Sequence, residues 1–131
     1  MNPVVHFEMP AEDQTRVKKF YETAFGWNMK QLGEEMGGYL LVGTTPVDEK
    51  MEHLNKGAIN GGFYKKGQGG ATSTHVVISV ENLESHMETV KSAGGEIVDK
   101  SMDIPGIGKF VMFKDTEGNG VGMLQPVPKN N

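Results

Sequence analysis

The chain of 131 residues carries 13 lysines and arginines against 17 aspartates and glutamates, which gives a formal net charge of −4 at pH 7. This length suits one well-filled core and is too short for two ordinary domains. An acidic balance without a lysine or arginine cluster argues against nucleic-acid binding. The sequence has no cysteine, which excludes a disulfide, a thiolate metal site and a cysteine nucleophile. No long apolar run or basic-then-apolar N-terminus occurs, so we expect a soluble, cytoplasmic protein without membrane contact.

The first predicted strand places two chemically active side chains next to each other. Residues 4–9 alternate between apolar and polar positions, which is typical of a half-buried β-strand. The apolar face carries Val5, Phe7 and Met9. His6 and Glu8 therefore lie side by side on the opposite face.

A helix is predicted directly after this strand. Pro10 ends the strand, and Asp13 is a good N-cap because its side chain can accept a backbone N–H of the first turn. Gly26 stands where a helix commonly ends in a left-handed residue. The apolar residues between these two points recur at helical spacing, at Val17, Phe20, Tyr21, Ala24 and Phe25.

Three further strands are predicted in the first half of the chain, over residues 27–32, 39–42 and 58–64. Segment 44–56, between the last two strands, has weak periodicity. Because a loop of this length is uncommon unless it has a function, we expect a lid over a site. Residues 65–73 are rich in glycine and polar residues and make the best linker in the sequence.

The same order of elements returns after the linker. Residues 74–80 alternate again and place His75 and Ser79 on one face of a strand. Asn82 can cap a second helix, which a pair of glycines ends. Strands are then predicted over residues 96–100, 109–114 and 120–125.

The two halves match in spacing. His6 precedes its helix cap, Asp13, by seven residues, and His75 precedes Asn82 by seven as well. A glycine follows each histidine by twenty residues. Few identities survive, but two related strand–helix units are the economical interpretation.

The sequence therefore predicts an α+β fold in a single domain over residues 1–131. Two βαβββ modules, about 1–64 and 74–131, joined by the linker at about 65–73, would form a curled, mostly antiparallel sheet around a concave cavity. Each helix would cover the apolar face of its strands, and both histidines would lie on the concave face.

Several of these residues also form a recognisable pattern. They are His6, Asp13, Phe20-Tyr21, Phe25-Gly26-Trp27, the run from His75 to Val80, Gly94-Gly95 and Asp115-x-x-Gly118-Asn119. In this pattern the chain resembles the vicinal oxygen chelate superfamily, which includes glyoxalase I, extradiol dioxygenases, and fosfomycin- and bleomycin-resistance proteins. The resemblance covers nearly the whole chain. It implies the fold, a small-molecule ligand and a homodimer, but no particular reaction, because the superfamily contains lyases, isomerases, dioxygenases and pure binding proteins.

The resemblance also implies where a metal would bind. Metal-dependent members take one ligand from the first strand of each module and a carboxylate from a later strand. His6 and His75 stand at the first two positions and would hold a divalent ion such as Ni²⁺, Zn²⁺, Fe²⁺ or Mn²⁺. The two carboxylate positions fall at or next to Gly122 and near Asn60, so both carboxylates are lost.

Glu8 leaves three interpretations open. With His6 and His75 it would make a two-histidine, one-carboxylate metal site. It could instead pair with a lysine or arginine, or accept hydrogen bonds at the rim of the barrel. As a third interpretation, Glu8 is a catalytic group that exchanges a proton with a histidine.

The remaining predicted site residues line the cavity. Strand parity places Asn60, Tyr64, Ser79 and Leu124 on the concave face. Tyr39 could stack on a substrate.

Three hypotheses for function follow. The first is a glyoxalase- or dioxygenase-like enzyme with a metal on His6 and His75. The second is a metal-free protein that binds or sequesters a small organic molecule, in the manner of resistance proteins. The third is a metal-free acid–base enzyme that uses Glu8.

Overall fold

The computed structural model of the chain describes residues 1–50, 55–68 and 71–128. The first half contains β1 (Val4–Ala11), α1 (Gln14–Phe25), β2 (Asn28–Gln31), a 3₁₀ turn (Glu34–Met36), β3 (Leu40–Gly43) and β4 (Asn60–Lys65). The second half contains β5 (His75–Ser79), α2 (Leu83–Ser92), β6 (Glu96–Ile104), β7 (Gly108–Lys114) and β8 (Gly120–Pro126). Residues 51–54 of the predicted lid lie outside the described residues.

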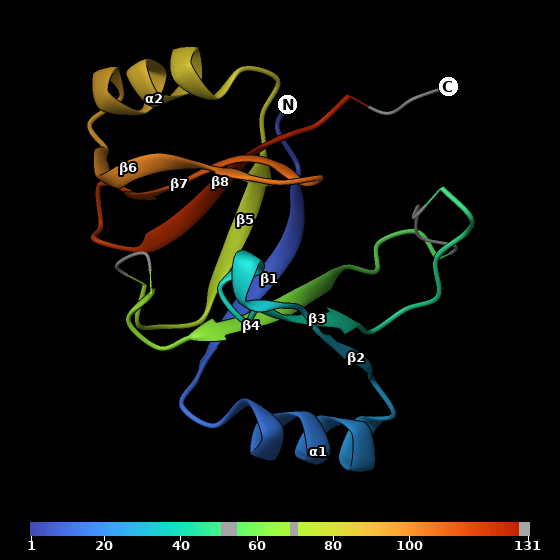
Figure 1. Ribbon diagram of the computed structural model, residues 1–131. Helices are drawn as coiled ribbons and strands as arrows, with labels where there is room; N and C mark the ends of the chain where they lie inside the picture. Colours follow the sequence, from blue (N-terminus) through green and yellow to red (C-terminus); the bar gives the residue numbers. More distant parts are fainter. Residues whose placement is uncertain (51–54, 69–70, 129–131) are drawn as a thin grey trace.

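All eight strands belong to one sheet, in the order β2-β3-β4-β1-β5-β8-β7-β6. Figure 1 shows β1 and β5 running together through the middle of the molecule, with α1 at one end and α2 at the other. β1 pairs with β4, and β5 with β8, in parallel, and the remaining neighbours are antiparallel. The sheet is curled and mixed, mostly antiparallel, so the predicted α+β class is confirmed.

The predicted helix caps are also present. Asp13 Oδ1 accepts a hydrogen bond from Arg16 N at 2.9 Å, and Asn82 Oδ1 accepts one from Ser85 N at 3.0 Å. Gly26 ends α1 in the left-handed conformation, with φ of 69°, which costs a glycine little. Within the described residues, neither helix is long and apolar enough to cross a membrane.

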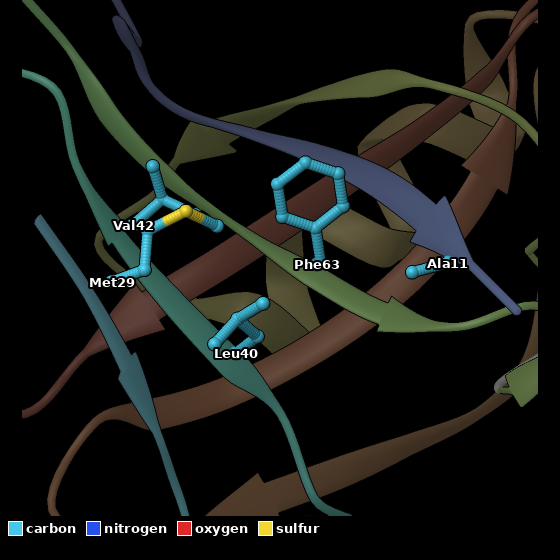
Figure 2. Close-up of a cluster of buried hydrophobic side chains, with 5 residues drawn as sticks. All are labelled: Ala11, Met29, Leu40, Val42 and Phe63. Carbon is cyan, nitrogen blue, oxygen red and sulfur yellow. The ribbon is translucent and has the colours of Figure 1, made fainter. Parts of the chain in front are cut away.

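The two modules bury separate cores on the helix side of the sheet. In the first, four strands contribute Ala11, Met29, Leu40, Val42 and Phe63, which Figure 2 shows as one cluster. In the second, the buried residues are Val80, Leu83, Val111 and Met123. Since alternate residues of a strand point to opposite faces, these cores leave the remaining positions of each strand for the concave face.

A third cluster lies on that concave face and joins the two modules. Its buried members are Tyr64, Ala71 and Met112, and Tyr39, Val98 and Phe110 pack against them. Residues from β4 and β7, which are far apart in the sheet order, therefore meet. The concave face is partly filled by the protein's own side chains.

The structure differs from the sequence-based prediction in the lengths of β1 and β6. Pro10 was predicted to end the first strand, but β1 continues to Ala11. β1 pairs with β5 only as far as Glu8, so Pro10 lies where one side of the strand is an edge, which tolerates a proline.

The predicted counterpart of β6 ends at residue 100, but β6 continues to Ile104. The pairing with β7 shifts between Val98 and Met102, and Asp99 adopts a φ of 65°. A bulge of this kind lets a strand continue beyond a break in its alternation, so the sequence pattern stops before the strand does.

Candidate functional site

The site begins with the pairing of the two central strands. β1 and β5 are antiparallel neighbours, and their register sets Glu8 directly opposite His75. Side chains in such a pair point to the same face of the sheet. His75 Nε2 lies 2.8 Å from Glu8 Oε1, and the exposed fractions of the two side chains are 2% and 14%. This buried contact joins the two modules.

Both ring nitrogens of His75 face an oxygen acceptor. Nε2 meets the carboxylate of Glu8, and Nδ1 donates to the carbonyl oxygen of Ser73 at 3.0 Å. Only the doubly protonated imidazolium can donate from both nitrogens, so we assign His75 as a cation paired with the Glu8 carboxylate. Burial lowers the pKa of His75. The hydrogen bonds to Glu8 and Ser73 and the charge of Glu8 outweigh burial and raise that pKa above its ordinary value.

His6, on the same face of β1 as Glu8, contacts the hydroxyl of Tyr39 with its Nε2 at 2.8 Å. Burial lowers the pKa of His6 below its ordinary value; the charge of Glu8 opposes this effect and that of His75 adds to it. We therefore assign His6 as neutral. His75 is therefore charged and His6 is neutral, because Glu8 is in direct contact with His75 only.

Tyr39 links His6 to Glu8. Burial, the charge of Glu8 and a hydrogen bond to Glu8 all raise the pKa of Tyr39 far above its ordinary value, so its hydroxyl keeps its proton. That hydroxyl has one proton to donate, and a carboxylate is the stronger acceptor. With Tyr39 donating to Glu8, its oxygen accepts from His6 Nε2–H. The Nε2 protons of both histidines and the hydroxyl proton of Tyr39 then form a chain that ends on Glu8, and the Nε2 of each histidine is occupied.

The network also explains why β4 carries glycine beside Tyr39. A Cβ built on Gly62 would overlap the Tyr39 hydroxyl oxygen. Gly62 lies directly opposite Glu8 in the β1–β4 register. Because it has no side chain, Tyr39 can cross β4 and reach the network.

The two predicted carboxylate positions are occupied in other ways. Asn60 Oδ1 accepts backbone hydrogen bonds from Thr44 at 2.7 Å and Thr45 at 3.1 Å, so it holds the start of the long loop. A Cβ built on Gly122 would lie 2.7 Å from the Phe110 ring. Phe110 therefore fills the space that a ligand side chain would need.

The hydrogen bonds of His6 and His75 bear on whether these predicted ligands could hold a metal ion. Among residues 1–50, 55–68 and 71–128, no group of three or more His, Asp or Glu side chains is arranged to hold a metal ion. A histidine can ligate a divalent ion only through an unprotonated ring nitrogen, and carboxylates commonly complete such a site. Here His75 donates from both nitrogens, and the Nε2 of His6 meets Tyr39. The donor set as arranged does not fit a divalent ion.

A cavity of about 170 Å³ opens beside His75. It is lined by Ala71, Thr72, Ser73, His75, Val98, Met112, Phe113, Lys114, Gly118 and Gly120. The ring of Tyr64 lies 5.5 Å from that of His75, and its hydroxyl donates to the carbonyl oxygen of Ser73 at 2.7 Å. Tyr64 thus supports the same wall of the cavity.

Two of the predicted lining residues, Ser79 and Leu124, lie away from this cavity. Ser79 pairs with Leu124 across β5 and β8, four residues along β5 from His75, which is about 13 Å in a strand. Sequence reasoning missed the hydroxyl of Tyr39, the carbonyl oxygen of Ser73 and the ammonium group of Lys114. The sequence pattern that could have indicated Lys114 is strand alternation, which places it on the same face of β7 as Phe110 and Met112.

Comparison with known proteins now identifies the family. The profile of the Glyoxalase/Bleomycin resistance protein/Dioxygenase superfamily matches residues 4–123, so the chain belongs to that superfamily. A glyoxylase-like domain-containing protein of Didymella fabae is 28% identical over 116 residues, which cover 86% of this chain and 84% of that protein. A putative glyoxylase, CFP32, of Mycobacterium bovis is 29% identical over 55 residues, or 42% of this chain and 21% of that longer protein.

Solved structures share the fold at much lower identity. A methylmalonyl-CoA epimerase in complex with methylmalonyl-CoA and NH4⁺ has a TM-score of 0.69 at 11% identity, over 100% of this chain and 99% of that one. The epimerase of Mycobacterium tuberculosis has a TM-score of 0.64 at 13% identity, over 96% and 89%. Likeness at this level establishes the architecture, and the site must be argued from its own residues.

The two histidines predict opposite effects of pH on stability. The raised pKa of His75 gives stability that is present below its ordinary value of 6.5 and lost as pH rises through the folded value. The lowered pKa of His6 gives stability that is present above 6.5 and lost as pH falls through its folded value. In the wild type, stability should fall above pH 6.5 because of His75 and below pH 6.5 because of His6. We expect His75→Gln to remove the loss of stability on the alkaline side, and His6→Gln to remove the loss of stability on the acid side.

The measurement is urea unfolding of the wild type and both variants at intervals from about pH 5 to pH 9. His86→Gln, at a half-buried position of α2, serves as the matched control and should keep the wild-type profile. If both substitutions changed the same side of the profile, the assigned charge states would be wrong.

Proposed function

We propose that this member of the superfamily binds a small organic molecule in the cavity beside His75 and needs no metal ion to do so. The observation that supports the proposal is that most of the candidate ligand atoms have partners within the protein. Glu8 accepts from His75, the Nε2 of His6 contacts Tyr39, and Asn60 holds a loop. A metal would have to break these contacts before it could bind.

The cavity has the composition of a small-molecule site. Val98 and Met112 give it apolar walls, while Ser73 and Lys114 add polar groups at its edge. Apolar walls with a few fixed polar groups are typical of ligand pockets. Structural neighbours bind a CoA ester. A ligand of that size would exceed about 170 Å³, so only its acyl end would enter here.

A second candidate is acid–base chemistry on the bound molecule. The imidazolium–carboxylate contact between His75 and Glu8, at 2.8 Å, favours it, because a proton can pass between two groups at that distance. In such a reaction the Glu8 carboxylate would take a proton from a carbon next to a carbonyl group, and the electron pair would remain on the substrate as an enolate. The predicted homodimer is also kept as a proposal; the exposed Phe20 and Phe25 of α1 would give it an apolar surface.

The metal-free proposal predicts the outcome of a thermal-shift series. Ni²⁺, Zn²⁺, Fe²⁺ and Mn²⁺ should raise the melting temperature of untagged wild-type protein no more than they raise those of His6→Ala and His75→Ala. A ligand that binds only the folded state stabilises it by mass action, so a true site would be visible. Stoichiometric metal that both substitutions abolish would overturn the proposal and establish a metal centre on these histidines.

The acid–base candidate predicts exchange of a carbon-bound hydrogen. In D₂O, an acyl compound that binds the cavity should lose the hydrogen next to its carbonyl group, measured by proton NMR. Glu8→Gln should slow this exchange by about 10²-fold or more while binding remains. Exchange that is equally fast with Glu8→Gln, or absent with the wild type, would leave binding alone as the function.

A further inference from the structure

The cavity beside His75 is lined by basic residues, although the chain as a whole is acidic. The chain carries a net charge of −4, yet the cavity wall contains Lys114 and His75, and none of the described residues that line it is acidic. Glu8 balances the charge of His75 through their direct contact. The ammonium group of Lys114 therefore provides the net positive charge of the wall.

Among the described residues, Lys114 has no ion-pair partner. Glu96 lies opposite it in the β6–β7 register, but none of the ion pairs among the described residues includes Lys114. The carboxylate of the neighbouring Asp115 accepts hydrogen bonds from the backbone and side chain of Asn119, each at 2.9 Å. On its other side Lys114 pairs with Gly120, which leaves the space beside it open to the cavity.

The remaining walls limit the size and polarity of the ligand. A volume of about 170 Å³ corresponds to roughly six non-hydrogen atoms, at the ~30 Å³ that each water occupies in the liquid. Val98 and Met112 would contact an apolar group, which an inorganic anion lacks. The hydroxyl of Thr72 stands on the same wall as a donor.

From these features we infer that the ligand of the cavity is a short-chain carboxylate, held by Lys114 as its anion anchor, with its alkyl end against Val98 and Met112. This inference rests on the proposed small-molecule function and adds the class of ligand. Lys114 would set specificity for acids over neutral analogues. Lys114 is exposed at the edge of the cavity, but a contact between its ammonium group and a carboxylate is still stronger than a neutral hydrogen bond, and this difference gives the anchor a measurable effect.

The test compares propionate with its neutral isostere propionamide by titration of ¹⁵N-labelled protein, with the backbone amides of Ser73 and His75 as reporters. Propionate should bind about tenfold or more tightly than propionamide, as expected for a hydrogen bond to a charged group. Lys114→Gln should reduce the affinity for propionate to that for propionamide and leave propionamide unchanged. Lys109→Gln, at the other end of β7, is the matched control and should keep the preference.

The outcomes separate the anchor from the function. Equal affinities for acid and amide, or a preference that survives Lys114→Gln, would overturn the anchor while small-molecule binding stands. Cavity amides that no probe moves would overturn both proposals. The ¹⁵N spectrum of each variant shows directly whether it is folded.

Discussion

The organisation of the concave face depends on the contact between Glu8 and His75. It joins the central strands of the two modules, and it makes His75 a cation that donates from both ring nitrogens. The same carboxylate accepts from Tyr39, whose oxygen then accepts from His6. Removing one member of a buried pair leaves an uncompensated charge, at a cost of about 3–5 kcal/mol. Glu8 is therefore the residue whose loss would disturb the site most.

This network gives the familiar fold a different use of its histidines. The sequence-based interpretation expected His6 and His75 to hold a metal ion, but their Nε2 atoms contact Tyr39 and Glu8. Phe110 fills the space beside Gly122. Within one fold, function is set by the side chains that meet at the site, and here they meet as a hydrogen-bonded network beside a small, positively charged cavity.

The sequence predicted the fold well because local patterns determine it. Alternation located β1 and β5, and the equal spacing from His6 to Asp13 and from His75 to Asn82 revealed the two modules. These signals depend on strand parity and helix capping, which short segments express on their own. The predicted end of β6 was wrong because a bulge at Asp99 interrupts the alternation of the strand.

The site was less predictable because its contacts join distant residues. Glu8 and His75 are separated by 67 positions, and the partner expected for Glu8 in a structural role was a lysine or arginine. The role of Tyr39 depends on Gly62, whose missing side chain lets the ring cross β4. Sequence parity put Ser79 and Leu124 on the correct face, but it could not tell how far along the strands the cavity lies.

The most direct test of the account is the protonation state of the four ring nitrogens of His6 and His75, read by ¹⁵N NMR near pH 7. The account predicts that His75 is protonated on both nitrogens and that His6 is neutral with its proton on Nε2. An unprotonated Nε2 on His75 would contradict the donor pattern on which the metal-free site depends.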